Sequence, residues 1–101
     1  LNPVICHITL ADQGSLLFYK KNYQSKFKHI RSIPVKNVVD IIGCGDAFEA
    51  AFVLKYLKQE KIKKATKYAH KVAAANCTFV GSSEIKKIKK MVKYYSKSSV
   101  I

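Results

Sequence analysis

Apolar residues in the first third of the chain form short runs that are separated by polar turns. Val4–Leu10 is apolar and rich in β-branched residues, a pattern that predicts a buried strand. Turn-forming residues follow at Ala11–Gly14, and Ser15–Lys20 predicts a second strand, antiparallel to the first. Phe27–Val35 alternates in part and predicts a third strand, whose end Pro34 confines to a sheet edge.

After Gly45 the apolar spacing becomes helical. We expect one helix over about Asp46–Lys58, a second over about Ile62–Thr78 and a third from near Glu84. The Val-Gly-Ser-Ser stretch that begins at Val80 separates the second helix from the third. The first helix has few charges on any side, which predicts that it is buried on more than one face.

The order of these elements is strands first and helices afterwards. That order fits a free-standing α+β domain, and it also fits the closing part of a larger α/β protein. The chain has 101 residues, enough for one small domain with a limited core. No apolar run approaches the roughly 20 residues that a membrane span needs.

The beginning of the chain and its cysteines bear on the compartment. The first residue is Leu1, from which we expect that upstream residues are missing, and no signal-peptide pattern appears. The three cysteines, Cys6, Cys44 and Cys77, form no CxxC pair, so the sequence indicates neither a disulfide framework nor a zinc site. We expect reduced thiols in a cytoplasmic protein.

The net charge of +13 is strongly basic. Such a balance is compatible with a nucleic-acid binder, a binder of acidic membranes or an enzyme for anionic substrates. Only Arg31 is an arginine, whereas sequence-specific nucleic-acid readers mostly use the arginine fork. Lysines scattered along helices more often form a solvated face, as we expect for Lys86–Lys97.

The stretch Val38–Phe52, with the sequence VVDIIGCGDAFEAAF, carries the candidate chemistry. Two glycines lie where a β-branched segment turns into a helix, so the backbone there permits a tight turn and the close approach of a ligand. Amides at the start of a helix suit a phosphate. Asp46 would repel a passively bound phosphate, but it is suited to accept the proton of an alcohol. The alternative is a plain turn in which Asp46 caps the helix.

This stretch resembles the C-terminal signature of the ribokinase family, also called the phosphofructokinase-B carbohydrate kinase family. Ile41 and Ile42 stand where the family usually has threonines, and Cys44 stands where it has alanine. The residues that match the signature are Asp40, Gly43, Gly45, Asp46 and Phe48.

Two flanking segments resemble the same family. His7–Gly14 is similar to its nucleotide-binding Thr-Leu-Gly-x-x-Gly segment, with Ala11 in place of a glycine. Tyr68–Ser83 resembles the alanine-rich helix and glycine loop that close over the adenine. The resemblance runs from about Val4 to Ser83 and covers roughly the last third of a family member. It implies a ribokinase-like α/β fold, present here as the C-terminal portion only, with antiparallel strands followed by three helices.

The resemblance also implies roles for individual residues. Asp46 would be the catalytic base, and its amide with those of Gly43, Cys44 and Gly45 would form the anion hole. The ATP site would be lined by Thr9, Gly14 and His70. A monovalent cation would be held, mostly through backbone carbonyls, by Asp40, Ile42, Asn76 and Gly81. The implied cofactors are ATP and Mg²⁺, with K⁺ as a further candidate.

Each of these roles has a structural alternative. His70 on an alanine-rich helix is an ordinary partly buried residue in many proteins. Asn76 could instead satisfy buried backbone groups near a helix end. Cys44 could be a simple substitute for alanine in a tight turn. Ala11 has a Cβ that would crowd the nucleotide or shift the backbone.

The sequence therefore predicts that the parent protein phosphorylates a sugar hydroxyl with ATP. This chain would carry the anion hole and the base, and would be inactive alone because the sugar-binding N-terminal portion is absent. The Gly-Cys-Gly-Asp variant resembles fructosamine-type kinases. The expected partners are the sugar or sugar derivative, the rest of the kinase and a second copy in a homodimer, without membrane or nucleic acid. The alternative is a small, basic, non-catalytic domain that binds nucleic acid or a protein.

Overall fold

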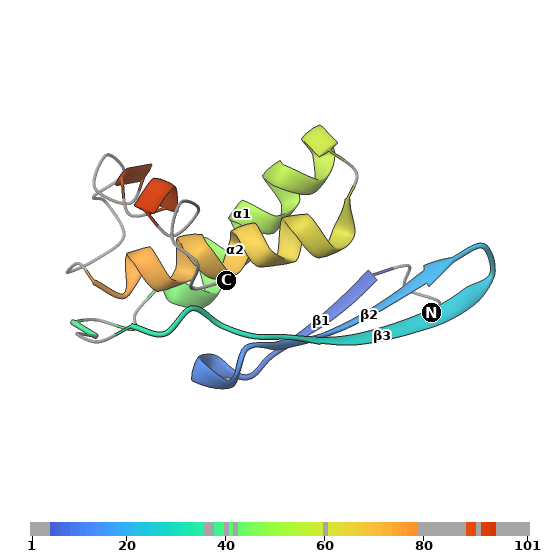
Figure 1. The fold of residues 1–101 in the computed structure, drawn as a ribbon, viewed down its shortest axis with the longest axis horizontal. Coiled ribbons are helices and arrows are strands. Elements are labelled where there is room, and N and C mark those ends of the chain that lie inside the picture. The colour runs from blue at the N-terminus through green and yellow to red at the C-terminus, as the bar shows by residue number, and fades with distance from the viewer. Residues whose placement is uncertain are drawn as a thin grey trace.

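Two tight connections fold residues 5–30 into an antiparallel sheet, and two helices lie across one face of it (Figure 1). The computed structural model describes residues 5–35, 38–39, 41, 43–59, 61–78, 89–90 and 92–94. The strands are β1 (Ile5–Thr9), β2 (Ser15–Lys21) and β3 (Gln24–Ile30), in the spatial order β1-β2-β3. The helices are α1 (Cys44–Gln59) and α2 (Ile62–Asn76), and a short 3-10 turn, η1 (Ala11–Gln13), joins β1 to β2.

The first two strands agree with the prediction, including their antiparallel pairing. The third strand begins at Gln24 instead of Phe27, because a two-residue turn at Asn22 and Tyr23 connects it directly to β2. Both turn residues have positive φ, 53° and 65°, as in the hairpin turn whose twist matches that of the flanking strands. The strand ends at Ile30, five residues before the predicted end at Val35.

The register divides the sheet residues between two faces. Leu17 pairs with His7 on one side and Lys28 on the other, and it is fully buried beneath the helices. The opposite face is apolar but uncovered among the described residues. There Phe18 pairs with Phe27, their ring centroids lie 4.8 Å apart, and the side chains are 39% and 55% exposed.

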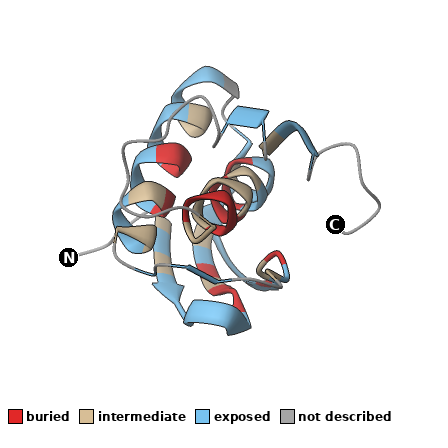
Figure 2. Cartoon of the chain, turned by 90° about the vertical axis from the view of Figure 1, so that its left-hand side faces the viewer, coloured by how far each residue is buried: buried red, intermediate tan, exposed pale blue. Residues whose placement is uncertain are grey.

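The core lies where α1 and α2 meet the sheet (Figure 2). Phe48 and Phe52 of α1 pack against Ala65 and Ala69 of α2. The two alanines are almost completely buried, and their small side chains let the helices approach closely.

Helix α1 begins at Cys44, two residues before the predicted start, and in the described part of the chain only one of its faces is covered. Val53, Leu54 and Leu57 on the opposite side are 47%, 63% and 72% exposed. Burial on more than one face was predicted, and these residues do not show it. In the described residues the shortage of charges leaves an open apolar surface, and burial of this face stays a prediction.

Helix α2 ends at Asn76, two residues before the predicted Thr78, where the Thr78 hydroxyl donates to the Ala75 carbonyl at 2.7 Å. The break predicted at Val80–Ser83 and the start of the third helix at Glu84 lie outside the described residues. Residues 89–90 and 92–94 are helical, and Lys89, Lys90 and Lys93 are exposed, as expected for a solvated face.

Candidate functional site

The Gly-Cys-Gly-Asp segment forms the start of α1. Gly43 has a φ of 82°, a conformation that L-residues with a Cβ rarely adopt, and it turns the chain into the helix. Its carbonyl accepts the Ala47 amide at 2.9 Å, while the Cys44 amide donates to the Ile41 carbonyl at 3.3 Å. Gly45 and Asp46 are exposed in the first turn, so their amides lie at the positive, open end of the helix.

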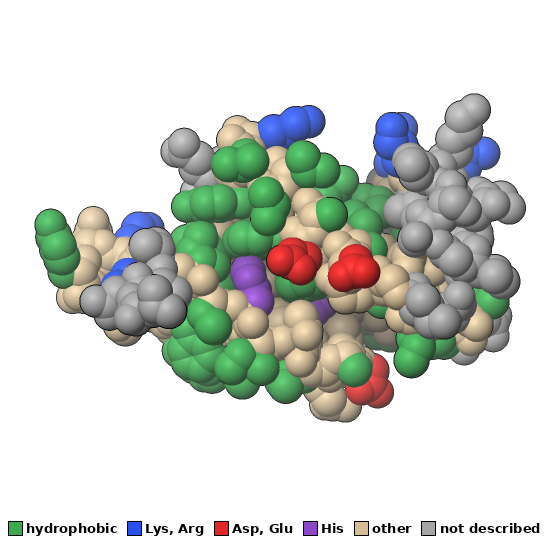
Figure 3. Space-filling view, turned by 180° about the vertical axis from the view of Figure 1, so that it is seen from behind, with side chains coloured by type: hydrophobic (Ala, Val, Ile, Leu, Met, Phe, Trp, Pro, Cys, Tyr) green, Lys and Arg blue, Asp and Glu red, His purple; other side chains and the backbone are tan. Residues whose placement is uncertain are grey.

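Space around this helix start is available to a ligand. A Cβ built on Gly45 would meet nothing within 4 Å, so the side of Gly45 that would carry a side chain is open among the described residues. Asp46 lines a shallow hollow together with Glu49, Ala50, Val53 and Leu54. Figure 3 shows acidic side chains set among apolar ones on this face of the molecule. A carboxylate beside exposed helix amides, at an apolar surface, can meet an alcohol and an anionic group at the same time.

Asn76 joins the end of α2 to the start of α1. Its side chain is fully buried, and its Nδ2 donates to the Cys44 Sγ at 3.6 Å. The Val39 amide reinforces this connection by donating to the Cys77 carbonyl at 2.8 Å. The predicted cation ligand Asn76 therefore lies beside the glycine segment. The structural alternative was that Asn76 satisfies buried backbone groups, whereas this contact is made to a side-chain sulfur.

The other predicted cation ligands, Asp40, Ile42 and Gly81, lie outside the described residues. Among the residues that are described, no three His, Cys, Asp or Glu side chains gather into a group that could hold a metal ion. The cation site therefore stays a prediction. The described residues include all three cysteines, and no disulfide joins them.

The second glycine segment lies at the connection between β1 and β2. Thr9 is exposed at the end of β1, and the Leu10 amide donates to the Gly14 carbonyl at 2.8 Å to close the turn. Gly14 has a φ of 90°, and a Cβ on it would lie 2.0 Å from the Ile30 carbonyl oxygen. Ala11 has a φ of 52°, so the position where the family usually has glycine adopts the backbone that glycine favours.

His70 lies in the core rather than at an open surface. It is 6% exposed, and its Nε2 is 2.8 Å from the Ser15 hydroxyl oxygen. Its ring packs edge-on against the Phe48 ring, with 4.7 Å between the ring centroids. These contacts fit the structural alternative, in which His70 is a buried helix residue. The predicted ATP contact of His70 stays a prediction.

A second histidine bond, which the sequence reasoning missed, also joins the sheet to α2. His7 Nε2 lies 2.8 Å from the Thr66 hydroxyl, which itself donates to the Ile62 carbonyl at 2.9 Å. Because that hydroxyl has only one proton, His7 Nε2 must be the donor of their bond. Thr66 and His70 are four residues apart on α2 and therefore share one helix face, which was the available sequence signal.

These contacts place the two glycine segments at the same end of the domain. Ser15 directly follows Gly14 and bonds to His70. The His70 ring contacts Phe48, which lies two residues after Asp46. The buried pair Ser15–His70 thus fixes the first strand connection relative to the start of α1.

Burial lowers the pKa of His7 and lowers that of His70 to about 4, with the positive charges of His7 and His29 as smaller causes. In the unfolded chain both imidazoles become protonated near pH 6.5, whereas in the folded chain they become protonated only at lower pH. Stability should therefore be complete above pH 6.5 and decrease as pH falls from 6.5 towards 4, with a loss of up to about 3 kcal/mol from His70.

Urea unfolding at a series of pH values measures this loss. His70→Gln, which keeps a hydrogen-bonding group but cannot titrate, should have a flatter profile than the natural chain even if it is less stable throughout. Equal slopes for the two proteins between pH 6.5 and 4 would contradict the assignment.

The chain matches the model of the pfkB family carbohydrate kinases over residues 5–89. Ribokinase from Thermotoga maritima is 26% identical, and the match covers 88% of this chain and 30% of that protein with a TM-score of 0.71. Arabidopsis thaliana ribokinase, solved with ribose and ATP, is also 26% identical, and the match covers 89% of this chain and 29% of that protein with a TM-score of 0.73.

Aminoimidazole riboside kinase from Salmonella enterica, solved with aminoimidazole riboside and an ATP analogue, is 20% identical. The match covers 94% of this chain and 32% of that protein, with a TM-score of 0.74. No curated protein matches. The chain thus spans about a third of the length of these solved structures. No helix among the described residues is long and apolar enough to cross a bilayer. Because the family model covers most of the residues and the matched fold is that of ribokinases, the chain belongs to the pfkB family of carbohydrate kinases.

Proposed function

We propose that this chain supplies the nucleotide-binding and phosphoryl-transfer part of an ATP-dependent sugar kinase. The observation that carries the proposal is the open start of α1, where exposed backbone amides adjoin the Asp46 carboxylate. Family membership supports the reaction class, since the ribokinase relatives include a structure with ribose and ATP bound. It favours the kinase over the alternative of a non-catalytic basic domain.

In the proposed reaction Asp46 takes the proton of a sugar hydroxyl as that oxygen attacks the γ-phosphorus of ATP. The bond between the γ-phosphorus and the bridging oxygen breaks, and ADP leaves with the electron pair. The amides of Gly43, Gly45 and Asp46 donate to the oxygens of the transferred group, and the Cys44 amide joins them by exchanging its 3.3 Å bond to the Ile41 carbonyl for the ligand. They stabilise the charge on that group while the carboxylate stays directed at the hydroxyl.

The nucleotide would lie between the two glycine segments. Thr9 is exposed at the end of β1, and residues 10–13 of the turn that the buried Gly14 closes are exposed as well. Mg²⁺, when bound with the nucleotide, would neutralise charge on its phosphates. The proposed cation ligands Asp40, Ile42, Asn76 and Gly81 would lie next to the anion hole.

Substrate choice would reside outside this chain. The described residues offer only a shallow hollow beside Asp46, too open to select one sugar. We therefore propose that polypeptide corresponding to the remaining two-thirds of the family's length completes the sugar site. On this proposal the 101 residues alone bind nucleotide but do not turn over.

Nucleotide binding can be tested with the chain itself by two-dimensional amide NMR during titration with MgATP. The expected result is a saturable shift of the amides of Gly14, Gly45, Asp46 and Ala47, with little change at Lys55 in the middle of α1. Shifts that spare the start of α1 would contradict the proposal.

Two variants at Gly45 sharpen the test, because a Cβ added there meets nothing within 4 Å. Gly45→Asp places a negative charge in the anion hole, and Gly45→Asn places a neutral group of the same shape. The aspartate should weaken MgATP binding about tenfold more than the asparagine does. Equal affinities for the two variants would remove the anion hole from this position.

A further inference from the structure

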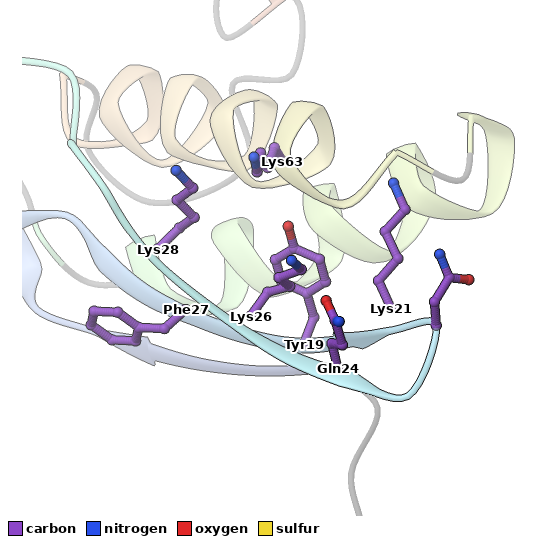
Figure 4. A pocket seen from close by; sticks show the side chains of 8 residues that line it. Tyr19, Lys21, Gln24, Lys26, Phe27, Lys28 and Lys63 are labelled. Atoms are coloured by element: carbon purple, nitrogen blue, oxygen red, sulfur yellow. The ribbon is translucent and has the colours of Figure 1, made fainter.

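Four lysines from two separate parts of the chain gather at the other end of the domain. They line an open cleft of about 480 Å³ between the tip of the β2–β3 hairpin and α2 (Figure 4). The lining residues are Tyr19, Lys21, Asn22, Gln24, Lys26, Phe27, Lys28 and Lys63.

The strand register explains why these lysines converge. Tyr19 pairs with Lys26, and Lys21 pairs with Gln24, so these side chains share the face that the helices cover. Lys28 pairs with the buried Leu17 on that same face. In Figure 4 Lys21, Lys26 and Lys28 extend from the sheet towards α2, and Lys63, in the first turn of α2, lines the same cleft.

No carboxylate balances these charges among the described lining residues. The described acidic residues Asp12, Asp46 and Glu49 belong to η1 and to the first turns of α1. The first turn of α2, which contains Lys63, has no acidic residue either. Each ammonium group in the cleft therefore repels the others, and a bound anion would relieve that repulsion.

The cleft is separate from the proposed phosphoryl-transfer site. The seven residues of β2 lie between Gly14 and the hairpin, and a strand of that length spans roughly 20 Å. One bound nucleotide would have its phosphates either at α1 or among these lysines, and it could not place them at both.

We propose that this cleft is a second anion site, and that its ligand is a compact oligophosphate. Lysines provide flexible point charges without the planar fork of arginine, which suits a group with several phosphate oxygens in no fixed orientation. The Tyr19 hydroxyl and the side-chain amides of Asn22 and Gln24 add neutral donors. The volume accommodates a triphosphate, free or as part of a nucleotide.

The test uses inorganic tripolyphosphate as the probe, with the chain carrying Gly45→Asp so that the site at α1 is blocked. Isothermal titration calorimetry compares Lys26→Gln/Lys28→Gln with Lys20→Gln/Lys90→Gln. Both doubles remove two charges, but Lys20 lies on the opposite face of β2 and Lys90 lies in the C-terminal helical segment. The cleft double should weaken binding about tenfold, and the control less than twofold, at about 0.1 M salt.

Equal losses for the two doubles would show only a general attraction of anions to a basic chain and would overturn the proposal. Titration with ATP distinguishes the two sources of the phosphate group: tighter binding of ATP assigns the site to a nucleotide, and equal or weaker binding assigns it to free oligophosphate. Hairpin amide shifts with a single-stranded oligonucleotide, in the absence of any with tripolyphosphate, would also overturn it. If the Gly45 variants do not change the affinity for MgATP, the difference in tripolyphosphate affinity between the two lysine doubles is still expected. The two proposals can therefore fail separately.

Discussion

Asp46→Asn is expected to lower kcat about a thousandfold in the proposed sugar kinase. The substitution keeps the size and shape of the side chain but removes the ability to accept a proton, and a positioned general base commonly contributes between about 10² and 10⁴. Asp46 is exposed at the start of α1, so the change should leave the fold intact. The KM for ATP should change little, because the amides beside the residue remain.

Glu49→Gln is the matched control for that experiment. Glu49 lies one helical turn further along α1, lines the same hollow and has the same charge. Its neutralisation should change kcat less than about threefold. Normal turnover by Asp46→Asn, or an equal loss in Glu49→Gln, would mean that the role of Asp46 is electrostatic or structural rather than that of a base.

Gly14→Ala is expected to destabilise the fold by about 3 kcal/mol or more. The added Cβ would lie 2.0 Å from a backbone oxygen at Ile30, and the φ of 90° is unfavourable for any residue with a side chain. Backbone cannot move aside as a flexible side chain would, so either β3 shifts or the turn opens. Urea unfolding monitored by circular dichroism measures the loss.

The reciprocal change, Ala11→Gly, should stabilise the chain by about 1 kcal/mol. Ala11 has a φ of 52°, and the left-handed conformation costs an alanine roughly 1–2 kcal/mol, part of which the greater freedom of unfolded glycine offsets. A decrease in stability for Ala11→Gly, or a neutral Gly14→Ala, would show that the turn relaxes into another conformation.

The pattern of apolar and polar residues predicted most bounds of the strands and helices to within a few residues. The exceptions depend on the conformation of a turn or on what packs against a helix face. A β-branched run predicted β1, the apolar run after the first turn predicted β2, and alanine-rich spacing predicted α2 within two residues. The start of β3 was predicted three residues late, because a hairpin turn made of Asn22 and Tyr23 lacks the glycine that usually marks it. The second apolar face of α1 is uncovered among the described residues, since an apolar face does not specify what covers it.

The site shows the same division. The glycine spacing and Asp46 could be read directly, because the groups lie within four residues of one another. The bonds of His7 and His70 could not, since they join a strand to a helix more than fifty residues away. The lysine cleft required the register of β2 with β3, which brings residues from both strands to one face.

Those two histidine bonds also bear on how the chain folds. The sheet is built from neighbouring strands and the helices pack on each other across a two-residue connection, so each half can form from local contacts. The His7–Thr66 bond joins residues that are 59 apart in the sequence, and the Ser15–His70 bond joins residues that are 55 apart. Bringing such distant segments together costs chain entropy that nearby pairings avoid. Docking of the helices on the sheet is therefore the expected slow step, and both imidazoles must give up their water during it.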